Sequence, residues 1–203
     1  MLFKDVRFKS VRYYKATAKK KRIIIKNLHW ARDSQVDMLF ELLENDVSIN
    51  LNDAFLIDFD GNIYRLYQEY YTGDITPFGY YYNLSSVSIA VLNEGVVVKK
   101  GNSYISSYTG RISENDVIQL SEWRGYNYFA KYTDEQIDAL CDLILYLLRN
   151  NDITFNFTNT FDVIQRIDLP GVYFYCNFSI SALHPTPALF KLSDKLKHIA
   201  KYG

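Results

Sequence analysis

The side chains of this sequence that could bind a metal or act as nucleophiles are few and widely spaced. The chain has three histidines and two cysteines: His29, His184, His198, Cys141 and Cys176. They follow no zinc-ligand spacing, and the two cysteines fit no disulfide framework. No Ser-His-Asp order, Cys-His nucleophile pair or phosphate-binding glycine loop is present either. These residues alone predict no cofactor.

Two stretches bring carboxylates close to glycine. The string "DFDGN" at 58–62 lacks the later carboxylates of a calcium loop, so we interpret it as a hairpin turn in which Gly61 supplies a positive φ. The string "RIDLPGVYF" at 166–174 places Asp168 shortly before Pro170 and Gly171, with no histidine nearby. Whether Asp168 could take part in a reaction or bind a ligand depends on the strands and helices around it.

Strands and helices alternate along the chain. The strongest helix signal is 133–150, where Thr133 and Gln136 form a capping box ahead of an apolar stripe that includes Cys141, which we expect to be an inert buried thiol. Further helices are expected at 33–44, 114–123 and near the C-terminus, from Leu189 to Ile199. Strands are expected at 22–26, 55–58, 63–66, 87–93, in a hairpin within 95–110, and at 173–181. This order predicts an α/β domain with a mixed central sheet flanked by helices.

Composition is that of an ordinary globular protein, with 48% hydrophobic and 23% charged residues in a chain of 203. We expect one domain over 1–203, with a basic arm at 1–22 and a C-terminal extension at 181–203. There is no signal peptide and no apolar run long enough to span a membrane, which favours a virion or the host cytoplasm. The arm carries nine basic residues and one acid. It could contact nucleic acid or an acidic partner, but lysines that protect an edge strand explain it better.

The order of these pieces resembles the zinc-dependent N-acetylmuramoyl-L-alanine amidases, a family that includes phage lysozymes and peptidoglycan recognition proteins. The matching stretches span about residues 22–175 and are "IIIK", "AFLIDFDGNIYRL", "SIAVLN", "YTDEQIDALCDLILYLL" and "RIDLPGVYF". In that family a histidine ends the first strand, a second histidine follows the long helix, and an Asp or Cys precedes Pro-Gly. The resemblance therefore implies an amidase-like fold.

The family's chemistry does not carry over with the fold. Its zinc needs two histidines and one Asp or Cys, but Lys26 stands at the first ligand position, and the second falls among Thr158, Thr160 and Phe161. Asp168 remains at the third, and Leu92 replaces a family glutamate. We therefore expect a vestigial groove of Lys26, Leu92 and Asp168 in which lysine and aspartate pair in place of the metal, and no bound metal.

Three functions remain open. The first is an inactive amidase-fold protein, or pseudoenzyme, that is a structural or assembly component of a phage virion (tail or head-tail region) and acts through protein contacts or as an oligomer. The second is a peptidoglycan-binding module. The third is an active amidase with a metal site rebuilt from His29, His184 and either Cys176 or Asp168. The first gains from a run of tyrosines that would suit an interface as well as an internal aromatic layer: Tyr70, Tyr71, Tyr80, Tyr81 and Tyr82.

Overall fold

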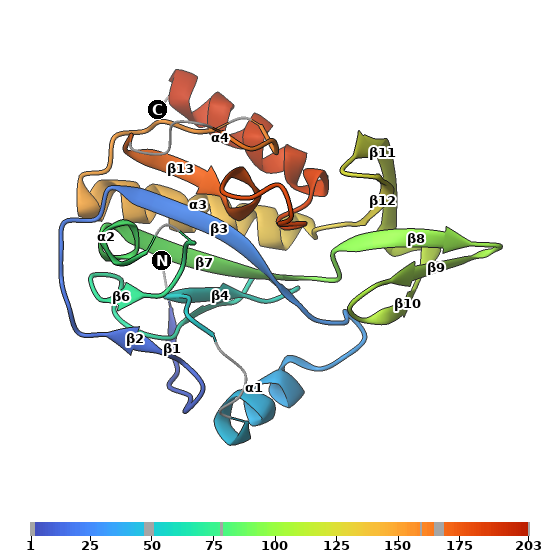
Figure 1. Cartoon of the computed structure of the whole chain (residues 1–203), viewed down its shortest axis with the longest axis horizontal. Helices are drawn as coiled ribbons and strands as arrows, with labels where there is room; N and C mark the ends of the chain where they lie inside the picture. The colour runs from blue at the N-terminus through green and yellow to red at the C-terminus, as the bar shows by residue number, and fades with distance from the viewer. Residues whose placement is uncertain (1–2, 47–50, 78, 159, 165–168, 203) are drawn as a thin grey trace.

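Six strands form the central sheet of the computed structural model, in the order β1-β5-β4-β7-β3-β13 (Figure 1). The structure describes residues 3–46, 51–77, 79–158, 160–164 and 169–202, with side chains as far as residue 197. Every pairing in this sheet is parallel except that of β4 with β5, which is antiparallel, so the sheet is mixed as predicted. Its strands are β1 (Lys4–Asp5), β3 (Arg22–His29), β4 (Phe55–Ile57), β5 (Ile63–Arg65), β7 (Ser86–Asn93) and β13 (Gly171–Phe174).

The centre of the sheet is the long parallel pair β3 and β7. Their register runs from Arg22 opposite Ser86 to His29 opposite Asn93. Every residue of β7 is buried, which is typical of a parallel strand covered on both faces. The hairpin of β4 and β5 turns at Gly61, whose φ of 77° confirms the positive value expected there.

Helix α3 (Asp134–Asn151) covers one face of this sheet, behind β3 in Figure 1. Its capping box is formed as predicted: the Thr133 hydroxyl accepts from Gln136 N at 3.0 Å, and Gln136 Oε1 accepts from Thr133 N at 3.1 Å. The apolar stripe of α3 packs in one core cluster with Ile23 and Ile25 of β3. Cys141 belongs to the same cluster, and burial raises the pKa of its thiol to about 11, so it is inert as expected.

The remaining helices are α1 (Val36–Asn45), α2 (Tyr80–Leu84) and α4 (Phe190–Tyr202), with short 3-10 turns at η2 (Tyr175–Asn177) and η3 (Pro187–Leu189). A two-stranded sheet joins β2 (Tyr13–Tyr14) to β6 (Thr72–Gly73). Helix α4 lies beside α3 and is tied to it by ion pairs of Lys191 with Asp134 and of Lys195 with Asp138. No helix within the described ranges is long and apolar enough to cross a bilayer.

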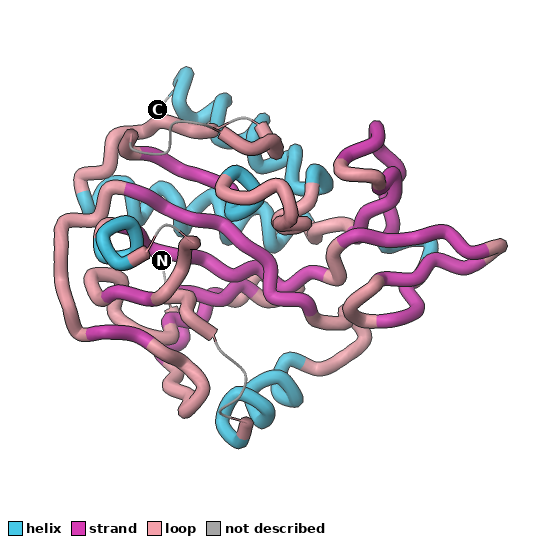
Figure 2. Tube along the Cα trace, viewed as in Figure 1, coloured by secondary structure: helices cyan, strands magenta, loops and turns pink. Residues whose placement is uncertain are grey.

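A second sheet of five strands is inserted between β7 and α3, and it extends to one side of the central sheet (Figure 2). Its order is β10-β9-β8-β12-β11, and its strands are β8 (Val96–Lys100), β9 (Ser103–Ser106), β10 (Gly110–Ile112), β11 (Val117–Trp123) and β12 (Tyr126–Ala130). The hairpin predicted within 95–110 is confirmed. The helix predicted at 114–123 is wrong: only the 3-10 turn η1 (Glu114–Asp116) is helical, and β11 pairs with β12.

The basic N-terminal arm forms an edge of the central sheet, since β1 pairs with β5. This placement supports the edge-strand interpretation of its lysines. Several of its charges are satisfied within the chain: Lys9 pairs with Glu44 at 3.0 Å and Lys19 with Asp152 at 2.9 Å. Lys20 is buried, and its ammonium donates to two backbone carbonyls. Burial lowers the pKa of Lys20 to about 8.

Arg124 fastens the inserted sheet to the C-terminal third of the chain. It stands with Gly125 in the two-residue turn between β11 and β12, and both residues have positive φ, as a type I′ turn requires. The guanidinium donates to four backbone carbonyls, those of Phe161, Cys176, Ser179 and Ala182. One side chain therefore satisfies carbonyls from two separate loops.

Replacing Arg124 by asparagine should lower the free energy of unfolding by about 2–4 kcal/mol. Four carbonyls lose a charged hydrogen-bond donor, and hydrogen bonds to water replace only part of the lost stabilisation. Asparagine tolerates the left-handed backbone, so the turn itself is preserved. Urea unfolding measures the change. Arg111→Gln on exposed β10 is the matched control and should change stability by less than about 0.5 kcal/mol. Equal effects of the two substitutions would contradict this role for Arg124.

Candidate functional site

Lys26 lies in the middle of β3, on the face of the sheet opposite to α3. Ile24, two residues earlier, belongs to a separate apolar cluster from that of Ile23 and Ile25, as alternation along a strand requires. The Lys26 ammonium lies 3.0 Å from Asp53 Oδ2. The Asp53 side chain is fully buried, and that of Lys26 is 16% exposed. The position thus holds a largely buried ion pair.

Asp168, the expected partner of Lys26, lies outside the described residues. The strand that follows it is described, however, and Gly171 pairs with Arg22 while Phe174 pairs with Ile25. Gly171 therefore lies at the level of Arg22, which is about 13 Å along β3 from Lys26. The residues that follow Phe174 therefore continue toward the Lys26 end of the sheet. The described partner of Lys26 is Asp53, and its pairing with Asp168 stays a prediction without structural support.

Beyond Lys26, four aromatic rings stack across the end of β3, and we call them the four-ring ladder: Tyr108, His29, His184 and Tyr175. Tyr108 and His29 lie 3.6 Å apart between centroids and are nearly parallel. His29 meets His184 edge to face at 5.5 Å, and His184 stacks on Tyr175 at 5.0 Å. Asn27 N donates to His184 Nδ1 at 3.4 Å. The structure therefore brings together two of the three histidines, as the rebuilt metal site would require.

Both histidines of the ladder are held neutral. Burial lowers the pKa of His184 to about 3, assisted by repulsion from the Lys26 ammonium and from His29 once His29 is protonated. Burial also lowers the pKa of His29 to about 4, against a smaller opposite effect of its hydrogen bond to the Asn93 backbone. Cys176, the other candidate ligand, is fully buried, and burial raises its thiol pKa to about 12. In the metal-free chain this thiol is therefore protonated, and a zinc ion would have to displace the proton to bind it.

The tetrahedral zinc that the sequence resemblance implies needs three protein ligands. Within the part of the chain that the structure describes, no three His, Cys, Asp or Glu side chains group closely enough to hold a metal ion. The Lys26 ammonium, at the position that the sequence resemblance assigns to the first ligand, would repel a divalent cation. The described side chains therefore do not fit zinc.

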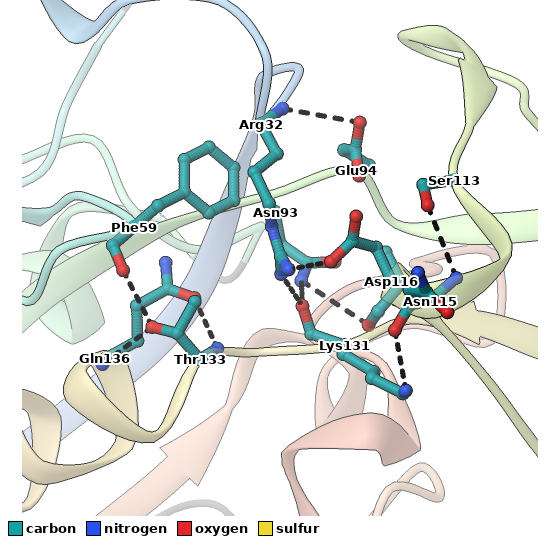
Figure 3. A network of polar contacts seen from close by, with 11 residues as sticks. Arg32, Phe59, Asn93, Glu94, Ser113, Asn115, Asp116, Lys131, Thr133 and Gln136 are labelled. Carbon is teal, nitrogen blue, oxygen red and sulfur yellow. Dashed lines mark hydrogen bonds and ion pairs between the residues drawn. The ribbon is translucent and has the colours of Figure 1, made fainter.

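Figure 3 shows a polar network at the carboxyl end of β7, where the inserted sheet meets the central one. The Arg32 guanidinium pairs with Asp116 and donates to the Lys131 carbonyl at 2.7 Å. The Arg32 backbone N–H donates to Glu94 Oε1 at 3.3 Å, and the Lys131 ammonium donates to the Asn115 carbonyl at 2.7 Å. These contacts join the loop after β3 to both ends of the insertion.

Leu92 belongs to this region as a core residue. Its side chain is fully buried, and its carbonyl accepts from Gln136 Nε2 at 2.7 Å. Thr133 in turn donates to the Phe59 carbonyl, so the start of α3 is tied to β7 and to the β4–β5 turn. The acid closest to Leu92 in sequence is Glu94, which is buried and whose pKa is raised mainly by that burial. Leu92 therefore lines the core and offers no acidic group.

The five candidate interface tyrosines separate into three environments. Tyr80 and Tyr81 on α2 are 52% and 83% exposed and meet each other edge to face. Tyr82 is half-buried, with the Arg22 guanidinium over its ring. Tyr70 and Tyr71 lie in the segment after β5 and line a separate cavity. Only Tyr80 and Tyr81 therefore form an exposed aromatic pair on a helix.

Three site residues escaped the sequence reasoning: Asp53, Tyr108 and Tyr175. Asp53 directly precedes the apolar run of β4, and an acid in that place could have been singled out as a buried partner for Lys26. Tyr108 comes from the inserted sheet and Tyr175 from the turn after β13. No local pattern marks either of them, because both reach the ladder through tertiary packing.

Comparison with solved structures identifies the fold. The chain is similar to the N-acetylmuramoyl-L-alanine amidase LysC from Clostridium intestinale, with 17% identity, 96% of this chain and 97% of that chain covered, and a TM-score of 0.50. It is also similar to peptidoglycan recognition protein-LE in complex with tracheal cytotoxin (15% identity, 92% and 86% covered, TM-score 0.53). The Ph2119 endolysin from a Thermus scotoductus bacteriophage matches at 10% identity, 91% and 89% coverage and a TM-score of 0.52.

The fold is thus that of the amidases and peptidoglycan recognition proteins, with a mixed central sheet flanked by helices, as the sequence resemblance implied. No protein-family model and no curated protein matches the chain by sequence. At these identities the likeness extends to the fold alone.

Proposed function

We propose that this chain is a catalytically inactive protein on the amidase fold, and that it acts as a structural or assembly component by binding other proteins. The observation that carries this proposal is the ion pair of Lys26 with the buried Asp53. The sequence resemblance assigns the first zinc ligand of the family to the position of Lys26. A zinc hydrolase of this fold needs the metal to lower the pKa of its attacking water. An ammonium at that position supplies neither a ligand nor that water.

The exposed pair of Tyr80 and Tyr81 supports the binding part of the proposal. Tyrosine is enriched in protein interfaces because the ring buries apolar area while the hydroxyl keeps a polar partner. The setting we propose is a phage particle, in which the chain would contact other virion proteins or its own copies. The phage origin of one fold neighbour supports this setting. Detection of the chain by mass spectrometry in purified virions would test it directly.

The metal part of the proposal predicts that the purified chain retains no zinc in equilibrium dialysis. Lys26→His should retain none either, because one new histidine does not complete a set of three ligands. One tightly held zinc per chain would contradict the proposal. If His29→Ala or His184→Ala then released that zinc, the metal site would be the rebuilt one, and the active-amidase function would replace ours.

Peptidoglycan binding without hydrolysis is the second candidate function. It is favoured by the likeness to peptidoglycan recognition protein-LE, whose structure is a complex with tracheal cytotoxin, a monomeric peptidoglycan. The two candidates separate in a sedimentation experiment with insoluble peptidoglycan. Retention on the pellet, lost in competition with soluble fragments, supports the second function. A chain that stays in the supernatant supports the first.

A further inference from the structure

A cavity of about 550 Å³ lies between the N-terminal arm and the segment that follows β5. This volume is in the range of small-molecule sites, roughly 300–1,000 Å³. The two segments that line it differ in character: the arm is rich in positive charge, and the second segment is rich in tyrosines. β5 is three strands away from β3 across the sheet, about 14 Å at the spacing of neighbouring strands. The lining residues of the cavity do not include Lys26 or Asp53, although Tyr67 reaches toward Asp53 through its hydrogen bond to the Asn52 carbonyl.

The charge of the cavity is positive. Of its lining residues, Arg65 is held in a two-pronged contact by Asp5, at 2.6 and 3.0 Å, and lies 3.8 Å from Glu69. Asp5 and Glu69 together exceed the charge of Arg65 by one, and Arg65 with a smaller effect of Arg7 lowers the pKa of Asp5. Arg7 and Lys15 also line the cavity and are exposed, and neither makes a hydrogen bond or ion pair with another described residue. Two cations therefore remain available to an anion.

Tyrosine rings form a fixed wall of the same cavity. Tyr13 lies nearly parallel to Tyr67 at 4.9 Å and to Tyr71 at 5.5 Å between centroids. Tyr70 meets Tyr71 edge to face at 4.7 Å and is itself 46% exposed. Tyr13 packs against Tyr71, and Tyr71 in turn packs against Tyr70, so the Tyr70 ring is ordered before a ligand binds. A flat ligand can therefore contact this ring with little loss of side-chain entropy. Tyr67 anchors the wall, because its hydroxyl donates to the Asn52 carbonyl at 2.7 Å.

We propose that this cavity binds a small ligand in which a phosphate group is joined to a ring, as in a nucleotide or a sugar phosphate. The doubly charged phosphate is held by Arg7 and Lys15, whose guanidinium fork and ammonium suit its several acceptor oxygens. The ring of the ligand lies against Tyr70 and the edge of Tyr13. Because the arm supplies both cations and the segment after β5 supplies Tyr70, the ligand also fastens the arm to the body of the protein.

Isothermal titration calorimetry at low salt tests the proposed binding site with three probes: adenosine monophosphate, glucose 6-phosphate and inorganic phosphate. We expect one-to-one binding of at least one of the two ring phosphates, about tenfold tighter than inorganic phosphate, because stacking adds to the charge contacts. The preferred probe tells whether the ring is a base or a sugar. Thermal unfolding should shift to higher temperature with the same ligand, since it binds only the folded chain.

Three variants locate the binding. Arg7→Gln with Lys15→Gln and, separately, Tyr70→Ala should each weaken it about tenfold or more, and all three side chains are exposed, so folding is preserved. Lys100→Gln, at the exposed end of β8, is the matched control and should leave the affinity unchanged. The proposal is overturned if neither ring phosphate binds saturably, if inorganic phosphate binds as tightly as both, or if the cavity variants bind like the control. None of these outcomes bears on zinc or on peptidoglycan.

Discussion

Replacing Lys26 by methionine should lower the free energy of unfolding by about 3–5 kcal/mol at neutral pH. The reason is Asp53, which is fully buried and has the Lys26 ammonium 3.0 Å away as its counter-charge. Methionine preserves the volume of the lysine stem but leaves the carboxylate buried without a partner. Asp53→Asn in the same background removes the stranded charge and should restore a large part of the loss. Chemical denaturation of the two single variants and the double variant measures the coupling.

A second cycle gives the control for this result. If Lys26 were paired with Asp168, coupling would appear between Lys26→Met and Asp168→Asn instead. We expect the substitutions at Lys26 and Asp53 to be strongly non-additive, whereas additivity within about 0.5 kcal/mol in the Lys26–Asp168 cycle would rule out the pairing expected from the sequence. Additive behaviour in the Lys26–Asp53 cycle would contradict the ion pair that we place at this position.

Acidification should destabilise the protein by several kcal/mol between about pH 6.5 and pH 3, through the two histidines of the four-ring ladder. In the unfolded chain both titrate near their ordinary pKa of about 6.5. In the folded chain burial lowers the pKa to about 4 for His29 and about 3 for His184. Below pH 6.5 the two histidines are thus protonated in the unfolded chain but remain neutral in the folded chain. Stability is lost down to the folded pKa values, and above pH 6.5 these residues contribute no pH dependence.

Phenylalanine at both positions isolates this effect, because it keeps the aromatic stacking and removes the titration. The double variant His29→Phe, His184→Phe should lose clearly less stability than the parent between pH 6.5 and pH 4, whatever its stability at pH 7. Carboxylates titrate equally in both proteins, so the difference between the two pH profiles reports the histidines. Parallel profiles would show that these imidazoles are not held neutral in the folded chain.

Local signals in the sequence were sufficient for the elements that depend on local chemistry. The capping box of Thr133 and Gln136, the Gly61 turn and the β-branched run of β3 each specify their element through contacts between near neighbours. The segment 114–123 shows the limit of such signals. Its spacing of Val117, Leu120 and Trp123 fits a helix, but pairing with β12 prevails and makes it a strand. The pairing of β11 with β12 depends on the whole inserted sheet. The spacing of apolar residues within 114–123 carries no information about that sheet.

The Pro170-Gly171 signal was interpreted as the end of a ligand loop, and the structure gives a different reason for it. A Cβ on Gly171 would lie 2.2 Å from the Asn156 carbonyl oxygen, and its φ of 153° also favours glycine. The glycine therefore permits β13 to begin against the 156–158 segment, at the far end of β3 from Lys26. Sequence order could place Gly171 at a strand end, but only the register shows which end of β3 it lies against.

Release of soluble muropeptides from purified peptidoglycan, with and without added zinc, is the most direct test of the account. Its central claim is that the Lys26–Asp53 pair and the neutral, buried ladder have replaced the metal chemistry of this fold. We therefore predict no release above a buffer control under either condition, from the parent chain or from Lys26→His. Release by the unmodified chain that a chelator abolishes, and that zinc restores, would contradict the claim.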